Sequence, residues 1–282
     1  MPETSFLLPL VLKSAVAPSG VALAVLAASR AARLHAPASL LAVVAGFLVS
    51  YFAIQHMQWS PVPKVALDWL PWITVLSAVA AVLVPRIGSA AGRIAARLVV
   101  TLLIGGLIVS SAIGSFGVTK AAVAAVAIAV VLAALWTLVA RPAQGAATRP
   151  LLLAVVAGGS GLALMMDSAQ SMGQLSGALA MVLAACILFA LPRLGTPFAS
   201  PAAAVAVLLL GALLATAHLY AGFSLGYVAL LAGALLIDPA LAALRRSERG
   251  GLPWIPAAVL TAIPVAVTVA LAVKAMQDSG GY

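Results

Sequence analysis

The sequence predicts an all-α integral membrane protein, a polytopic bundle of about ten transmembrane helices. Three observations lead to this fold class. Of the 282 residues, 65% are hydrophobic and only 7% are charged, whereas a soluble domain carries about 25% charged residues. The mean hydropathy is +1.21. The apolar runs are also longer than the roughly 18 residues that indicate a bilayer-spanning helix, so a water-soluble globule is excluded.

Ten apolar segments account for nearly the whole chain. They lie at residues 6–29, 38–56, 68–85, 97–113, 120–140, 150–167, 173–191, 201–219, 222–238 and 253–274. At roughly 20 residues per span, ten spans use about 200 residues and leave about 80 for connections and tails. Because no soluble domain fits in that remainder, residues 1–282 are predicted to form a single transmembrane domain.

Prolines and glycines mark the boundaries of these segments. The first segment is interrupted by Pro9 and Pro18, and short connections with Pro85 or Pro142 follow later ones. The segments 201–219 and 222–238 are the closest pair, separated only by the residues from His218 to Gly222. The number of spans therefore depends most on these two places.

The positions of the basic residues predict how the chain is threaded. With ten spans, all the arginines fall on one side of the membrane and the lysines fall on or toward the other. The arginines are Arg30, Arg33, Arg86, Arg93, Arg97, Arg141, Arg149, Arg193, Arg245, Arg246 and Arg249; the lysines are Lys13, Lys64, Lys120 and Lys274. Because cytoplasmic loops retain basic residues, the arginine side is predicted to be cytoplasmic, with both termini outside (N-out/C-out).

The net charge of +9 is thus explained by topology, and a nucleic-acid partner is not expected, because no basic run is interleaved with exposed aromatic residues. The tryptophans agree with this threading, since none falls at a predicted bilayer centre. The expected partner is the lipid bilayer, including its anionic headgroups. Other membrane subunits or a homo-oligomer remain alternatives.

The chain ends and the cysteine content suggest a location. Residues 1–4 lack the positive region of a signal peptide, so the first span is expected to be retained. The single cysteine, Cys186, excludes an intramolecular disulfide. The Ala-, Val- and Arg-rich composition is typical of a GC-rich bacterial genome. A helical multi-pass protein of such a cell is predicted to lie in the inner (cytoplasmic) membrane, because outer-membrane proteins are β-barrels.

The acidic residues are too few and too scattered for the common catalytic or metal-binding motifs. They are Glu3, Asp68, Asp167, Asp238, Glu248 and Asp278. No pair of carboxylates has the spacing that holds Mg²⁺ and a diphosphate, and no His or Cys pair has a metal-ligand spacing. The sequence therefore predicts neither catalytic residues nor a metal site, and an enzyme is the less favoured class.

Polar residues near the membrane gather toward the outer half, where ionisable groups are functional candidates. The predicted ligand-binding residues are Lys13, His56, Asp167, His218 and Tyr220. Lys13 lies about one-third of the way down the first span, where it can extend to the surface, pair with Asp167 or hold an anionic ligand. For Asp167 the alternative is a solvated helix end.

His56 and His218 end two predicted spans on the same side, an arrangement that could ligate a b-type haem inside an apolar bundle. Histidines that only form hydrogen bonds at the interface are the alternative, and in that case no cofactor is expected.

The Gly-Gly-Ser-Gly run at 158–161, followed two spans later by His218, resembles the motif of rhomboid intramembrane proteases. The resemblance implies a Ser160–His218 dyad with an activated serine. The chain departs from that family because Ser160 lies on a helix predicted to run outward, and the family's other polar residues are missing. Close helix packing at the glycines is the alternative, as it is for the Gly173/Gly177 and Gly222/Gly226 pairs.

Two classes of function follow from these patterns. The first is a small-solute transporter or permease with a polar vestibule on the outer side, favoured by the polar cluster and by prolines within spans. The second is a non-catalytic membrane-embedded subunit or scaffold of a larger complex, favoured by the scarcity of charge within the spans.

Neutralising the predicted ionic site tests the first class. We expect Lys13→Gln and Asp167→Asn each to reduce uptake of the solute, or the thermal stabilisation that the solute confers, because each removes one of two opposite charges at a similar depth. Unchanged behaviour of both variants would exclude a ligand site at these residues.

Overall fold

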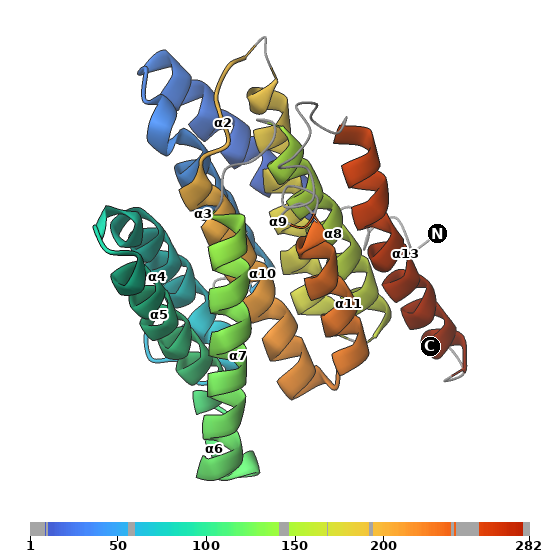
Figure 1. Ribbon diagram of the computed structural model, residues 1–282. Helices are drawn as coiled ribbons and strands as arrows, with labels where there is room; N and C mark the ends of the chain where they lie inside the picture. The colour runs from blue at the N-terminus through green and yellow to red at the C-terminus, as the bar shows by residue number, and fades with distance from the viewer. Residues whose placement is uncertain are drawn as a thin grey trace.

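A computed structural model describes residues 9, 11–55, 60–140, 147–167, 169–191, 194–237, 240 and 254–278, and the regular structure in these ranges is helical (Figure 1). The helices are η1 (Leu12–Val16), α2 (Ala17–Ala31), α3 (His35–Ile54), η2 (Ala66–Trp69), α4 (Leu70–Leu83), η3 (Val84–Arg86), α5 (Ala90–Ser110), α6 (Ile113–Phe116), α7 (Val118–Val139), α8 (Thr148–Met166), α9 (Gln170–Ala190), α10 (Ser200–Ala221), α11 (Leu225–Leu235) and α13 (Trp254–Asp278).

Within the described ranges, nine helical stretches are long and apolar enough to cross a membrane. They coincide with nine of the predicted segments, so a polytopic helical membrane protein is confirmed. The remaining segment, 222–238, contains α11, which has 11 residues. A helix of that length extends roughly 16 Å, about half of the roughly 30 Å hydrocarbon core.

A tight turn separates α10 from α11 and explains why the segment is shortened at its start. Gly222 ends α10 in the left-handed conformation (φ 74°), which glycine adopts without steric cost. The Ser224 hydroxyl then accepts a hydrogen bond from the Gly226 N–H at 3.3 Å and begins α11. Gly222 and Gly226 therefore form a turn, and the prediction that they are a helix-packing pair is wrong.

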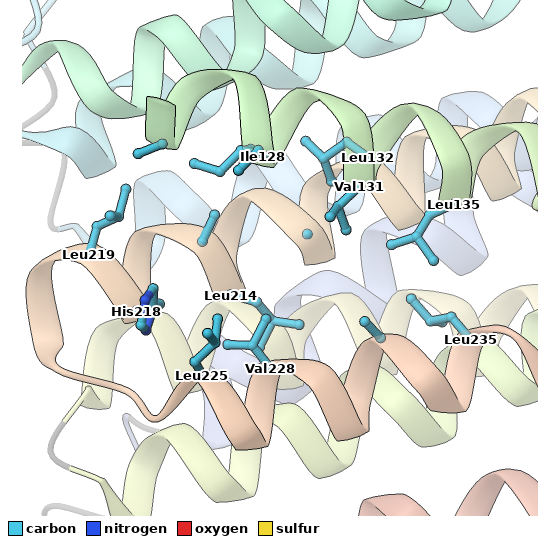
Figure 2. A pocket seen from close by; sticks show the side chains of 15 residues that line it. Ile128, Val131, Leu132, Leu135, Leu214, His218, Leu219, Leu225, Val228 and Leu235 are labelled. Atoms are coloured by element: carbon cyan, nitrogen blue, oxygen red, sulfur yellow. The ribbon is translucent and has the colours of Figure 1, made fainter. Parts of the chain in front are cut away.

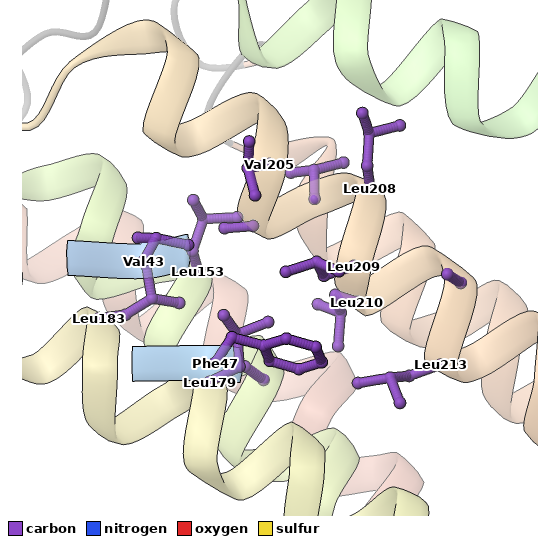
Figure 3. Packing of buried hydrophobic residues seen from close by; sticks show 14 of the residues in the cluster. Val43, Phe47, Leu153, Leu179, Leu183, Val205, Leu208, Leu209, Leu210 and Leu213 are labelled. Atoms are coloured by element: carbon purple, nitrogen blue, oxygen red, sulfur yellow. The ribbon is translucent and has the colours of Figure 1, made fainter. Parts of the chain in front are cut away.

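Helix α10 is the centre of the bundle. Every residue from Ala202 to Leu210 is buried, as expected for a helix that is apolar on all sides. It contacts α3, α4, α5, α7, α8, α9 and α11. Figure 3 shows Leu210 of α10 beside the ring of Phe47 of α3, with Leu179 of α9 on the other side of that ring's base. The remaining helices are organised around this one.

Two helix groups lie on either side of α10. In the first group α2, α3 and α9 pack together, α8 packs on α9, and α13 packs on α8. In the second group α5 packs on α7 and on α4. The short helix α11 contacts α8, α10 and α13 and so belongs with the first group. Figure 1 shows the second group on one side of α10 and most of the first group on the other.

A close helix contact joins α8 to α9 through glycines. A Cβ atom on Gly161 would lie 2.9 Å from the Gly173 carbonyl oxygen and 3.0 Å from the Gly177 amide nitrogen. The Ser176 hydroxyl crosses the same contact and donates to the Ala157 carbonyl oxygen at 2.8 Å. The expectation that Gly173 and Gly177 allow close packing is confirmed, as is usual for small residues between membrane helices.

Contacts between helix ends place the arginines on one side of the bundle. Arg30 at the end of α2 donates to the Leu194 carbonyl oxygen before α10 at 2.6 Å. The Ala199 N–H, at the start of α10, donates to Ser39 at the start of α3 at 3.0 Å. At the start of α5, Arg97 lies over Trp136 near the end of α7. The described arginines thus share one end of the bundle.

Substitution of Gly161 tests the α8–α9 contact. We expect Gly161→Ala to destabilise the protein by about 1–3 kcal/mol, the usual cost of overpacking, because the new methyl group meets backbone atoms of α9. The measurement is thermal unfolding of the purified protein in detergent.

Gly158→Ala is the matched control on the same helix, since its Cβ would lie 3.7 Å from the Ala180 Cβ, an ordinary contact. Equal stability of the two variants would contradict the proposed role of Gly161.

Candidate functional site

The predicted site residues lie on separate elements of the structure. Lys13 is part of the π-helical turn η1, Asp167 ends α8, and His218 and Tyr220 occupy the last turn of α10. His56 lies outside the described residues, so its predicted pairing with His218 around a haem is not placed by the structure.

Lys13 and Asp167 lie on different elements, and their predicted pairing stays a prediction. The turn η1 packs against α2, α3 and α9, whereas Asp167 follows the last residue of α8. Partial burial of Asp167 raises the pKa of its carboxyl above the usual value, as desolvation does for acids in general.

His218 and Tyr220 form hydrogen bonds within the protein. His218 Nδ1 lies 2.7 Å from the Phe223 carbonyl oxygen. Because a carbonyl oxygen only accepts, Nδ1 carries the proton and Nε2 is left for another partner. The Tyr220 hydroxyl donates to the Ile108 carbonyl oxygen near the end of α5 at 2.7 Å. Both side chains thus stabilise the end of α10, which leaves little of a polar vestibule there.

Ser160 is fully buried in α8, and its hydroxyl has no hydrogen-bond partner. The dyad with His218 that the rhomboid resemblance implies is therefore not formed. A Cβ on the neighbouring Gly159 would overlap Val265 of α13, and Gly161 packs against α9. The Gly-Gly-Ser-Gly run is a site of helix packing in this structure.

An apolar groove of about 270 Å³ lies between α7, α10 and α11. Figure 2 shows α7 along one wall, α11 along the other and α10 as the floor. Val131 and Leu135 line the first wall, and Leu225 and Val228 line the second. His218 lies at one end and is the only ionisable residue in the lining. We call this feature the apolar groove.

Small side chains create the apolar groove. Ala124 and Ala127 face it from α7, and Ala215 faces it from α10. At Gly211 the side chain of Leu132 takes the space that a Cβ would need. The two walls pack on α10 rather than extensively on each other, so the groove stays open between them. Sequence reasoning missed this site because it searched for polar residues. The available signal was the spacing of small residues, Ala124 and Ala127 on one helix and Gly211 and Ala215 on the other.

Comparison with known proteins does not supply a function. No protein-family model matches the chain, and no curated protein is significantly similar to it. Within the described ranges, no three His, Cys, Asp or Glu side chains come together as a metal site would require. The candidate site therefore has to be argued from the geometry of this chain.

The raised pKa of Asp167 leads to a pH-dependent prediction. Its carboxyl binds a proton more readily in the folded than in the unfolded chain, so folding stability falls as pH rises through the raised folded-state pKa. Asp167→Asn removes that ionisation. We expect the variant to melt at a higher temperature than the wild type at pH 7, with the difference vanishing near the ordinary value of 3.8.

The measurement is the melting temperature in detergent between about pH 4 and pH 7, the range above the ordinary carboxyl pKa. Asp278→Asn is the control, because it removes a carboxylate that is exposed at the end of α13. Parallel pH profiles for the wild type and Asp167→Asn would contradict the prediction.

Proposed function

We propose that this protein is a membrane transporter of a small amphipathic molecule, which it binds in the apolar groove. The observation that carries the proposal is the character of the groove: apolar along its length, with one histidine at its end. Ligand sites in proteins are mostly apolar hollows with a few polar groups that orient the ligand. The volume of about 270 Å³ is near the lower end of such sites, about 300 Å³.

The location of the groove favours a ligand that comes from the bilayer. Its floor and one wall belong to α10 and α7, two of the helices able to span the membrane. A molecule dissolved among lipid chains reaches it between α7 and α11 without crossing a polar barrier. His218, in the last turn of α10, is placed to meet the polar end of such a molecule with Nε2.

The helix grouping is compatible with the movement that transport requires. One wall, α7, packs with the second helix group, and the other wall, α11, packs with α13 and α8 of the first. A small rotation of one group relative to the other would widen or narrow the groove. Movement of one helix bundle against another around a fixed site is how many transporters give alternating access.

A non-catalytic membrane-embedded subunit is the second candidate. A specific observation favours it: Val123, Val126 and Val130 form an apolar stripe on α7 and are 66%, 52% and 54% exposed. Their spacing places them on one face of the helix. A partner helix packed there would make the protein part of a larger membrane complex or a homo-oligomer.

We place both termini outside and the arginine-bearing end in the cytoplasm of a bacterial cell, in the inner membrane. The support is the common end shared by the described arginines together with the retention of basic loops in the cytoplasm. In this orientation the His218 end of the groove faces the outer leaflet.

Closing the groove tests the proposed function. We expect Val131→Trp, which puts an indole ring into the groove, to reduce labelling by a photoreactive fatty acid roughly tenfold, equivalent to about 1.4 kcal/mol of binding free energy. Movement of the same probe across proteoliposomes should fall with it. Labelled peptides identified by mass spectrometry give the position of binding.

Val130→Trp is the matched control, since Val130 is the neighbouring valine of similar exposure and does not line the groove. Equal labelling of both variants and the wild type would exclude the groove as a binding site. Binding without transport, together with a partner that co-purifies in fixed ratio, would favour the subunit.

A further inference from the structure

Two arginines near the start of α5 lie on one face of the helix, because Arg93 and Arg97 are four residues apart. Arg93 Nη1 donates to the carbonyl oxygens of Ile87 at 3.0 Å and Gly88 at 3.2 Å. Arg97 Nη1 donates to Thr137 Oγ1 at 3.1 Å. Neutral groups on the segment before α5 and on α7 therefore hold both guanidinium groups in place.

The aromatic ring of Trp136 holds Arg97 from a second direction. The guanidinium carbon lies 5.6 Å from the ring centroid, within the range of a cation–π contact. Trp136 itself is 2% exposed, so its ring is fixed by the core. Arg97 Nε is buried without a hydrogen-bond partner. The protein thus orients the guanidinium but satisfies only part of its hydrogen-bonding capacity.

In the described part of the chain, the long helices that pack around these two arginines carry no carboxylate to balance their charge. The sequence contains no Asp or Glu between Asp68 and Asp167, a range that includes α4, α5, α7 and α8. Helix α10, which also contacts α5, has none either. Asp68 lies at the opposite end of α4 and accepts from the Lys64 and Val65 N–H groups. Among the residues that the structure describes, the pair thus has no acidic partner on α4, α5, α7, α8 or α10, and an anionic ligand can meet it there.

We propose that Arg93 and Arg97 bind the phosphate of an anionic phospholipid at the arginine-bearing end of the bundle. Guanidinium groups recognise phosphate oxygens by paired charge-assisted hydrogen bonds. The residue after each arginine is apolar and open to the surroundings: Ile94 is 51% and Leu98 is 41% exposed. Acyl chains can lie along these side chains while the phosphate meets the arginines, which favours a lipid over free phosphate.

The lipid site is separate from the apolar groove and does not depend on the proposed transport function. Its arginines lie on α5 at one end of the bundle, whereas His218 marks the groove at the other end. Basic pockets between membrane helices on the cytoplasmic side bind anionic headgroups in this way. The lipid would join α5 and α7 in addition to their direct packing.

The test compares lipids on the intact protein in detergent. We expect phosphatidylglycerol to raise the melting temperature of the wild type and to remain bound in native mass spectrometry, whereas phosphatidylcholine does neither. Because each arginine near the surface contributes to attraction of an anionic lipid, Arg93→Gln and Arg97→Gln should each weaken phosphatidylglycerol binding roughly fivefold. The double variant should lose nearly all of it.

Arg33→Gln is the control, because it removes an exposed arginine at the same end of the bundle, after α2. A wild type that phosphatidylglycerol does not stabilise, or a double variant that binds as Arg33→Gln does, would overturn the proposal. Equal stabilisation by inorganic phosphate at the same concentration would overturn the assignment to lipid.

Salt dependence provides a check that needs no variant. Screening by 0.5 M salt should remove much of the stabilisation of the wild type by phosphatidylglycerol, because the Debye length falls to roughly 4–5 Å. Stabilisation that is indifferent to salt would show that the contact is apolar, and it would overturn the role of the arginines.

Discussion

Hydrocarbon offers no water to a backbone N–H or C=O group, and this constraint organises the whole molecule. Each crossing is a helix, which satisfies the backbone within one segment. Each reversal needs a local solution, such as Gly222 and Ser224 between α10 and α11. The polar side chains follow the same rule: His218 and Tyr220 bond to the carbonyl oxygens of Phe223 and Ile108. The residues that look most available for chemistry thus complete the backbone hydrogen bonding.

Helices surrounded by lipid gain little free energy from burying apolar surface against each other, so their association depends on how closely their surfaces fit. Two uses of small residues follow. Between α8 and α9, glycines allow the backbones to approach until no Cβ fits. Between α7 and α11, alanines such as Ala124 and Ala215 help to leave the apolar groove open. Small residues therefore contribute both to a close contact between helices and to the apolar groove.

Composition and apolar run length were sufficient to predict the membrane class, nine of the spans and the common end of the described arginines. These properties depend on how far along a helix each residue lies, and residue numbers give that distance directly. The candidate site depends on which face of each helix a residue occupies and on which helices are neighbours, and residue numbers alone do not give either. Lys13 and Asp167 share a depth but lie on elements with different contacts, and the segment 222–238 counts as apolar although its turn shortens the helix. The apolar groove was not predicted because its lining is apolar, and the prediction relied on the positions of polar residues.

The central position of α10 has a consequence for how the protein is made. A chain emerges from the ribosome in order, so α3, α4, α7, α8 and α9 enter the membrane before the helix that they surround. Until Ser200–Ala221 has been synthesised, the faces that they turn toward α10 are exposed to lipid or to each other. The two helix groups can therefore reach their final arrangement only late in synthesis, after α10 has entered the membrane between them.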